Sequence, residues 1–152
     1  MPWRSSTSPP GCWRADGEAA GSPRLARVAE AAPDTYELFR RGIALLERGD
    51  HHAAIVALAK VREHEPGKDS VHEAYGRALF GARRFAEAAA EFAAVSDHDP
   101  TNHYALFCRG RALQQLGRHD EARAPLTQAA RLAPERDDYR RYLEMTLRHA
   151  GA

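Results

Sequence analysis

The sequence predicts an all-α protein, a solenoid of three helix pairs closed by a further helix at the C-terminal end. Three observations lead to this fold class. A 34-residue period runs from about residue 35 to 136, apolar residues recur at helical spacing inside each period, and each period closes on a proline. Because one helix pair cannot bury its own apolar face, the three pairs must stack on one another.

The period is visible as five columns of equivalent residues, spaced 34 apart (76 − 42 and 110 − 76 for the glycines). The columns are Gly42, Gly76, Gly110; Leu45, Leu79, Leu113; Ala54, Ala88, Ala122; Leu58, Phe92, Leu126; and Pro66, Pro100, Pro134. Glycine in the first helix and alanine in the second leave room for two antiparallel helices to meet near their turn. We expect the larger leucine or phenylalanine column to fill the space between neighbouring pairs.

The first helix of each pair is predicted over residues 35–48, 69–82 and 103–116. Asp34 and Glu37 form a D-x-x-E start signal directly after a proline. Gly49 and Gly117 are predicted to end the first helix in two repeats, where a left-handed backbone is useful. Arg83 occupies the equivalent position in the middle repeat, so we expect a less relaxed turn there.

The second helices are predicted over residues 52–64, 86–97 and 120–132, after which the prolines redirect the chain. Pro125 lies inside the third of these, and we expect it to kink that helix or delay its start. A capping helix is predicted over about residues 136–149, where apolar residues form one stripe among charges. These ranges make repeats of about 35–68, 69–102 and 103–136 within a domain spanning residues 34–149.

Residues 1–33 differ from the rest in being rich in serine, proline and glycine with no apolar period, so we expect them to be disordered. Trp3 and Trp13 are unusual in such a segment and could anchor a partner, although aromatic residues in tails commonly have no role. The two cysteines, Cys12 and Cys108, have neither metal-site nor disulfide-framework spacing. Together with the lack of an apolar run of about 20 residues, this favours a reduced, cytoplasmic setting.

Composition excludes several classes of partner. Lys+Arg number 22 against Asp+Glu 21, a formal net charge of +1, which gives no field for holding nucleic acid or an anionic membrane. We therefore expect neither nucleic acid nor membrane as a partner. The preference for arginine over lysine, with abundant alanine, hints at a GC-rich bacterial genome.

The pattern resembles the tetratricopeptide repeat (TPR), whose period is 34 residues and whose motif is W-x2-L-G-x2-Y…A-x3-F…P. Gly-x2-Leu, Ala-x3-Leu/Phe and the closing proline match in all three copies, over residues 35–136. Two motif positions depart from it. The tryptophan position holds Leu38, His72 and Leu106, and the leucine before glycine is Arg41, Tyr75 and Arg109. The resemblance implies a right-handed α-solenoid that holds a peptide or partner segment in a concave groove.

The resemblance further implies that the first helix of each pair lines this groove. Projected onto this chain, the lining is Tyr36, Phe39, Ile43, Glu73, Arg77, Phe80, Tyr104, Phe107, Arg111 and Gln114, with Arg141 extending the row. Tyrosine and arginine dominate binding energy at interfaces, and arginine grips carboxylates in a bidentate manner. We therefore expect a protein or peptide partner with acidic and apolar residues. For each aromatic residue, packing inside the protein is an equally good reading.

One ligand of such folds is disfavoured by the residues present. Some TPR co-chaperones clamp a chaperone's C-terminal carboxylate with lysine, asparagine and arginine side chains. The matching positions in this chain hold Phe39, Ile43, Ala74, Tyr104 and Cys108. No clamp of this type is therefore expected.

No catalytic constellation is found: there is no glycine-rich phosphate loop, no H-E-x-x-H and no nucleophile elbow. The histidines at 51–52, 98 and 103 lack zinc-ligand spacing and are expected to be solvated turn residues, and Cys108 is expected to be a small buried hydrophobe. We expect a non-catalytic interaction scaffold without cofactor or metal. Two alternatives stay open: self-association by solenoid stacking or helix swapping, and a metal or enzymatic role for the histidines.

Overall fold

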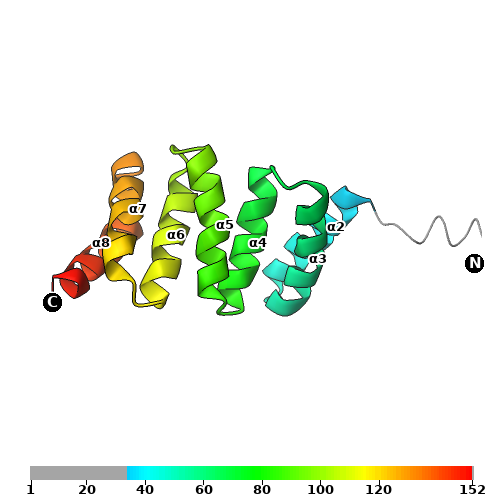
Figure 1. Cartoon of the computed structure of the whole chain (residues 1–152), viewed down its shortest axis with the longest axis horizontal. Coiled ribbons are helices and arrows are strands. Elements are labelled where there is room, and N and C mark those ends of the chain that lie inside the picture. The colour runs from blue at the N-terminus through cyan, green and yellow to red at the C-terminus, as the bar shows by residue number, and fades with distance from the viewer. Residues whose placement is uncertain (1–33, 152) are drawn as a thin grey trace, which may run out of the picture. The chain divides into compact units, whose positions relative to one another are not determined.

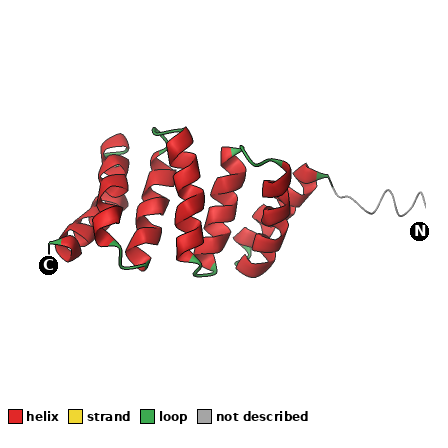
Figure 2. Cartoon of the chain, in the orientation of Figure 1, coloured by secondary structure: helices red, strands yellow, loops and turns green. Residues whose placement is uncertain are grey.

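The computed structural model describes residues 34–151, which form seven helices and no strand (Figures 1 and 2). The helices are α2 Thr35–Glu47, α3 His51–His64, α4 Asp69–Gly81, α5 Phe85–His98, α6 His103–Gln115, α7 His119–Leu132 and α8 Asp137–Ala150. The disorder expected of residues 1–33, and any role of Trp3 and Trp13, lie outside the described residues. No helix between residues 34 and 151 combines the length and apolarity needed to cross a bilayer.

Every helix begins and ends within one residue of the range predicted from the period. Pro125 does not shorten α7. The helix begins at His119, as the period predicts, and continues through the proline. Of the two effects expected of Pro125, a kink or a delayed start, the delayed start does not occur. Proline at this position removes one i→i−4 hydrogen bond, the one to the carbonyl of Glu121, and the rest of the helix is long enough to tolerate that loss.

The helices pack in chain order, with α2/α3, α4/α5 and α6/α7 as antiparallel pairs and α8 against α7. The first helices of the first two pairs, α2 and α4, also touch, and α6 touches the capping helix α8. One continuous apolar cluster runs from α2 to α7, and a smaller one around the fully buried Tyr139 joins α8 to α6 and α7. Burial is therefore shared between pairs, as the stacking argument requires.

Glycine is needed at positions 42, 76 and 110 because a side chain from the second helix of the same pair occupies the space that a Cβ would fill. A Cβ on Gly42 would lie 2.6 Å from the Leu58 side chain, and one on Gly76 would lie 2.9 Å from the Phe92 ring. Gly110 faces Leu126 in the same way. The members of the leucine and phenylalanine column thus pack on the glycine of their own pair, and they also belong to the apolar cluster that continues from one pair to the next, as expected. The facing alanines at 54, 88 and 122 are completely buried.

The turns between paired helices repeat one backbone conformation. Gly49 and Gly117 adopt φ values of 83° and 77°, in the left-handed region, and Arg83 adopts φ 65°. This confirms the expected glycine turns. It also confirms the strained middle turn, since a left-handed conformation costs a non-glycine residue about 1–2 kcal/mol.

A polar cluster ties the first pair to the second. The buried Glu91 on α5 accepts a 2.7 Å hydrogen bond from Nδ1 of His72 on α4, and its carboxylate also lies 3.2 Å from Arg62 on α3. The other ring nitrogen of His72 lies 2.6 Å from the carbonyl oxygen of Pro66, in the α3–α4 connection. Residues of three helices and one loop are thus fixed around a single carboxylate.

Candidate binding pocket between α4 and α6

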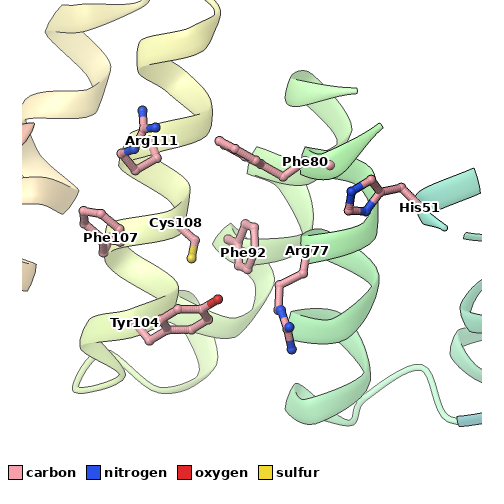
Figure 3. A pocket seen from close by; sticks show the side chains of 9 residues that line it. His51, Arg77, Phe80, Phe92, Tyr104, Phe107, Cys108 and Arg111 are labelled. Carbon is pink, nitrogen blue, oxygen red and sulfur yellow. The ribbon is translucent and has the colours of Figure 1, made fainter. Parts of the chain in front are cut away.

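A hollow in the described part of the chain lies between α4 and α6, with α5 beneath it, and has a volume of about 330 Å³ (Figure 3). We call it the α4–α6 pocket. Its lining is His51, Arg77, Phe80, Gly81, Phe92, Tyr104, Phe107, Cys108 and Arg111. Half of the ten predicted groove residues are brought together here: Arg77, Phe80, Tyr104, Phe107 and Arg111.

The inner surface of the pocket is apolar and rigidly supported. Phe92, only 1% exposed, packs over Gly76 and forms the floor. Phe80 makes an edge contact with Phe85, with ring centroids 5.0 Å apart. Phe107 stacks on Tyr139 of α8 at 4.3 Å. The sequence places Phe92 in the core but does not by itself identify it as the floor of this pocket. The glycine at position 76, over which the Phe92 ring packs, was the signal that could have indicated it.

His51 forms one edge of the pocket, against Gly81 at the end of α4. Any side chain at position 81 would overlap the His51 ring, so glycine is required by close approach. The His51 Nδ1 atom is buried and has no hydrogen-bond partner among residues 34–151. The expectation that His51 is a solvated turn residue is therefore wrong, because α4 of the next pair covers its ring. Its neighbour His52 is exposed.

Cys108 and Tyr104 lie one helical turn apart on α6 and face the pocket (Figure 3). Burial raises the pKa of the Cys108 thiol to about 12, against the lowering effect of a hydrogen bond from the Tyr104 side chain. Burial also raises the pKa of Tyr104, helped by the neighbouring Cys108. A neutral thiol of this kind is a poor nucleophile, so the pair supplies an apolar wall with a polar hydroxyl edge.

Arg77 is the exposed cation of the pocket. Among residues 34–151 its guanidinium makes no hydrogen bond or ion pair. The acidic residue one turn earlier, Glu73, instead accepts a 2.7 Å hydrogen bond from Nδ2 of Asn102. Asn102 is itself fixed, because its side-chain oxygen caps α6 by accepting from the backbone N–H of Ala105. The predicted groove residue Glu73 therefore belongs to the α4–α6 junction.

Arg111 occupies the same repeat column as Arg77 but is engaged inside the protein. Its guanidinium lies 4.0 Å from the ring centroid of Tyr142 on α8 and 5.8 Å from that of Phe80. It also donates a 3.1 Å hydrogen bond to Oε1 of Gln114. The structure thus distinguishes two arginines that the repeat pattern treats as equivalent.

Gln114 must be corrected as a groove residue, because it is buried at 8% exposure under the capping helix. Its amide donates to the backbone carbonyl of Tyr142 at 2.8 Å and to the hydroxyl of the buried Thr146. No repeat-based pattern could reveal this, since both partners belong to α8, outside the repeats.

The remaining predicted lining residues lie elsewhere. Tyr36 and Phe39 border a separate hollow of about 170 Å³ beside the α3–α4 connection, with Tyr36 68% exposed. Phe39 and Ile43 are half-buried and pack on the core cluster. Arg141 is exposed on α8 and does not line the α4–α6 pocket.

Residues 34–151 contain no group of three or more histidine, cysteine, aspartate or glutamate side chains arranged to hold a metal ion. The histidines instead make structural contacts. His119 stacks on His149 at 4.5 Å, and His103 Nδ1 lies 3.0 Å from the hydroxyl of Tyr139.

Comparison with known families and structures agrees with this architecture. A family model described as "Tetratricopeptide repeat" matches residues 45–107 and, overlapping, 79–144. No curated protein sequence matches.

Many solved structures share the fold. MamA MSR-1 superposes with a TM-score of 0.73 at 23% identity, covering 84% of this chain and 80% of that chain. The first TPR domain of Spaghetti (RPAP3), bound to the HSP90 peptide SRMEEVD, has a TM-score of 0.73 at 18% identity and coverages of 80% and 96%. The Sgt2 TPR domain from Aspergillus fumigatus has a TM-score of 0.70 at 19% identity and coverages of 78% and 80%.

Proposed function

The chain belongs to the tetratricopeptide repeat family, and we propose that it binds a segment of a partner protein in the α4–α6 pocket. The family is one of non-catalytic interaction modules, so the chain is a protein-interaction module and not an enzyme. The finer proposal concerns where the partner sits and which side chains hold it.

The observation that carries the proposal is the composition of the pocket. An apolar floor and walls of Phe92, Phe80 and Phe107 are rimmed by Tyr104 and by an exposed cation, Arg77, that forms no hydrogen bond or ion pair among the described residues. Aromatic and arginine side chains around a hollow are typical of the sites that contribute most to binding at interfaces. At about 330 Å³ the hollow is at the lower end of the roughly 300–1,000 Å³ of small-molecule sites, so it suits an anchoring side chain.

The mode of recognition proposed here differs from carboxylate clamping. The Spaghetti domain is seen with the peptide SRMEEVD, which combines acidic and apolar residues. In this chain the positions that resemble clamp positions hold Phe39, Ile43, Ala74, Tyr104 and Cys108, none of which is cationic. We propose a partner with acidic and apolar residues, without a requirement for a free C-terminus.

Affinity capture with a matched pair of variants tests the proposal. Tyr104→Ala combined with Phe80→Ala removes two walls of the pocket, whereas Val56→Ala with Leu132→Ala removes exposed apolar side chains on α3 and α7. Proteins captured by the wild type from cells that make it naturally should be lost with the first variant and kept with the second. Equal capture by both variants would contradict the proposal, and circular dichroism verifies that each variant is folded.

Self-association remains a separate prediction. Size-exclusion chromatography with light scattering distinguishes it, because a strictly monomeric chain over the working concentration range would exclude it. A dimer that resists the Tyr104→Ala and Phe80→Ala changes would place the self-contact outside the α4–α6 pocket.

A further inference from the structure

The two arginines of the α4–α6 pocket have different surroundings, and the difference bears on what the pocket binds. Arg111 is stacked on Tyr142 and hydrogen-bonded to Gln114, so its charge is already placed against an aromatic face and an amide. Arg77 is exposed and lacks any such partner within residues 34–151. The repeat column therefore contains one structural arginine and one available arginine.

The surroundings of Arg77 keep it available. Glu73 is four residues earlier on the same helix, the spacing at which an intrahelical ion pair forms. Asn102 donates a 2.7 Å hydrogen bond to the Glu73 carboxylate, and Glu73 and Arg77 form no ion pair within residues 34–151. Because Asn102 is also the N-cap of α6, this arrangement is fixed by the junction between the second and third pairs.

The floor of the pocket sets a second requirement. Phe92, Phe80 and Phe107 offer an apolar surface, and the neutral Cys108 thiol adds no charge to it. Burying a polar group there without a hydrogen bond would cost free energy, whereas burying apolar area contributes about 25 cal/mol per Å². In Figure 3 the Phe92 ring and the Cys108 sulfur lie between Arg77 on one side and Phe107 on the other.

We propose that the α4–α6 pocket selects a protein segment in which one large apolar side chain enters over Phe92 and a neighbouring carboxylate pairs with Arg77, while Arg111, held by α8, acts as a wall. This inference rests on the proposed function and names the chemistry of the partner. Charge complementarity is its basis, since an unpaired guanidinium beside an apolar hollow binds a carboxylate in bidentate fashion. The residue that determines specificity is thus Arg77.

Peptide selection tests the proposal. A phage-displayed library of random dodecapeptides is selected on the immobilised full chain, and enriched peptides are synthesised with acetylated and amidated ends. The expected peptides contain a large apolar residue with aspartate or glutamate within a few positions. Fluorescence polarisation should show at least about a tenfold loss of affinity when that carboxylate is changed to its amide, and a similar loss when the apolar residue becomes alanine.

Charge reversal identifies the arginine involved. Arg77→Glu should weaken the acidic peptide at least about tenfold and bind a lysine-substituted version better than the wild type does. Arg131→Glu, at an exposed position of α7 outside the pocket, is the matched control and should leave affinity unchanged. Both variants replace an exposed side chain, and thermal unfolding verifies that each retains the fold.

Three results would overturn the inference: enriched peptides without a carboxylate, affinity that is insensitive to Arg77→Glu, or repeated selections without any enriched peptide. Its failure is distinguishable from failure of the proposed function. If capture of the natural partner depends on Tyr104 and Phe80 but not on Arg77, the pocket binds a partner and only the assigned chemistry is wrong. If capture depends on none of the three, the site itself is wrong.

Discussion

At the scale of single residues, the glycines of the repeat column are the sites where one methyl group decides packing. A Cβ on Gly76 would lie 2.9–3.2 Å from three atoms of the Phe92 ring, closer than carbon atoms normally approach. Phe92 is also the floor of the α4–α6 pocket, so any shift of its ring changes the site. Phe92 therefore both fills the space beside Gly76 in the core and forms the floor of the proposed binding pocket.

Gly76→Ala should lower the free energy of unfolding by about 1–3 kcal/mol, because the core would be overpacked against Phe92. Gly67→Ala is the matched control, since a Cβ there meets nothing within 4 Å. Urea unfolding measures both. Equal stability of the two variants would show that the Phe92 ring can move aside freely.

Cys108 gives a pH-dependent prediction. Burial raises the pKa of its thiol from an ordinary 9.0 to about 12, so the native thiol stays neutral where an unfolded thiol has ionised. Since only the unfolded chain loses this proton between pH 9 and 12, rising pH over that window should lower stability. In a Cys12→Ser variant, alkylation by iodoacetamide should remain slow in the native protein up to about pH 11. A rate that reaches half its maximum near pH 9 would contradict the burial of this thiol.

The sequence predicted the conformation of single residues where equivalent positions of the repeats share it. The left-handed turn positions Gly49, Gly117 and Arg83 are an example. Prediction from the sequence failed where a neighbour from another pair sets the environment. His51 is covered by α4 at Gly81, a contact between residues 30 apart that the pattern of either residue alone does not reveal.

At the scale of elements, the helix bounds were predictable because the 34-residue period repeats the same start and stop signals three times. The role of α8 was not predictable in detail. The sequence indicates an amphipathic cap, but its contacts with Gln114, Arg111 and Phe107 arise only when α8 packs on α6. The capping helix thus supports one wall of the pocket as well as closing the core.

Gln114→Ala should loosen α8, because it removes the donor to the Tyr142 carbonyl and leaves the buried Thr146 hydroxyl without its partner. A loss of about 1–3 kcal/mol in stability is expected, with faster amide hydrogen exchange concentrated in α8. Gln115→Ala, at the adjacent exposed position, is the control and should change neither quantity. Uniformly faster exchange across all helices would instead indicate a general loss of packing.

At the scale of the whole described unit, stability depends on coupling between neighbouring pairs. The Glu91 cluster is the polar part of that coupling, since its carboxylate holds His72 of its own pair and Arg62 of the preceding pair. The Arg62 side chain is 46% exposed, so its share is modest, and the buried contact to His72 dominates.

Glu91→Ala should lower stability by about 1–3 kcal/mol, because His72 and Arg62 lose their common acceptor. Hydrogen exchange should accelerate most in α4 and α5, which lose the His72–Glu91 contact, and to a smaller degree in α2 and α3, which lose the contact through Arg62. Glu63→Ala, at an exposed position of α3, provides the control. If exchange in α2 and α3 stays as slow as in that control, the cluster does not couple the pairs.

The central claim is that the α4–α6 pocket is where a partner protein binds, and site-specific photo-crosslinking tests it most directly. A benzoylphenylalanine side chain replaces Tyr104, which borders the pocket and is 36% exposed, or Val56, which is 61% exposed on α3 outside it. Irradiation in the cells that make the protein should yield a discrete covalent adduct from position 104 and none of that mass from position 56. Adducts that form from position 56 and not from 104 would contradict the claim.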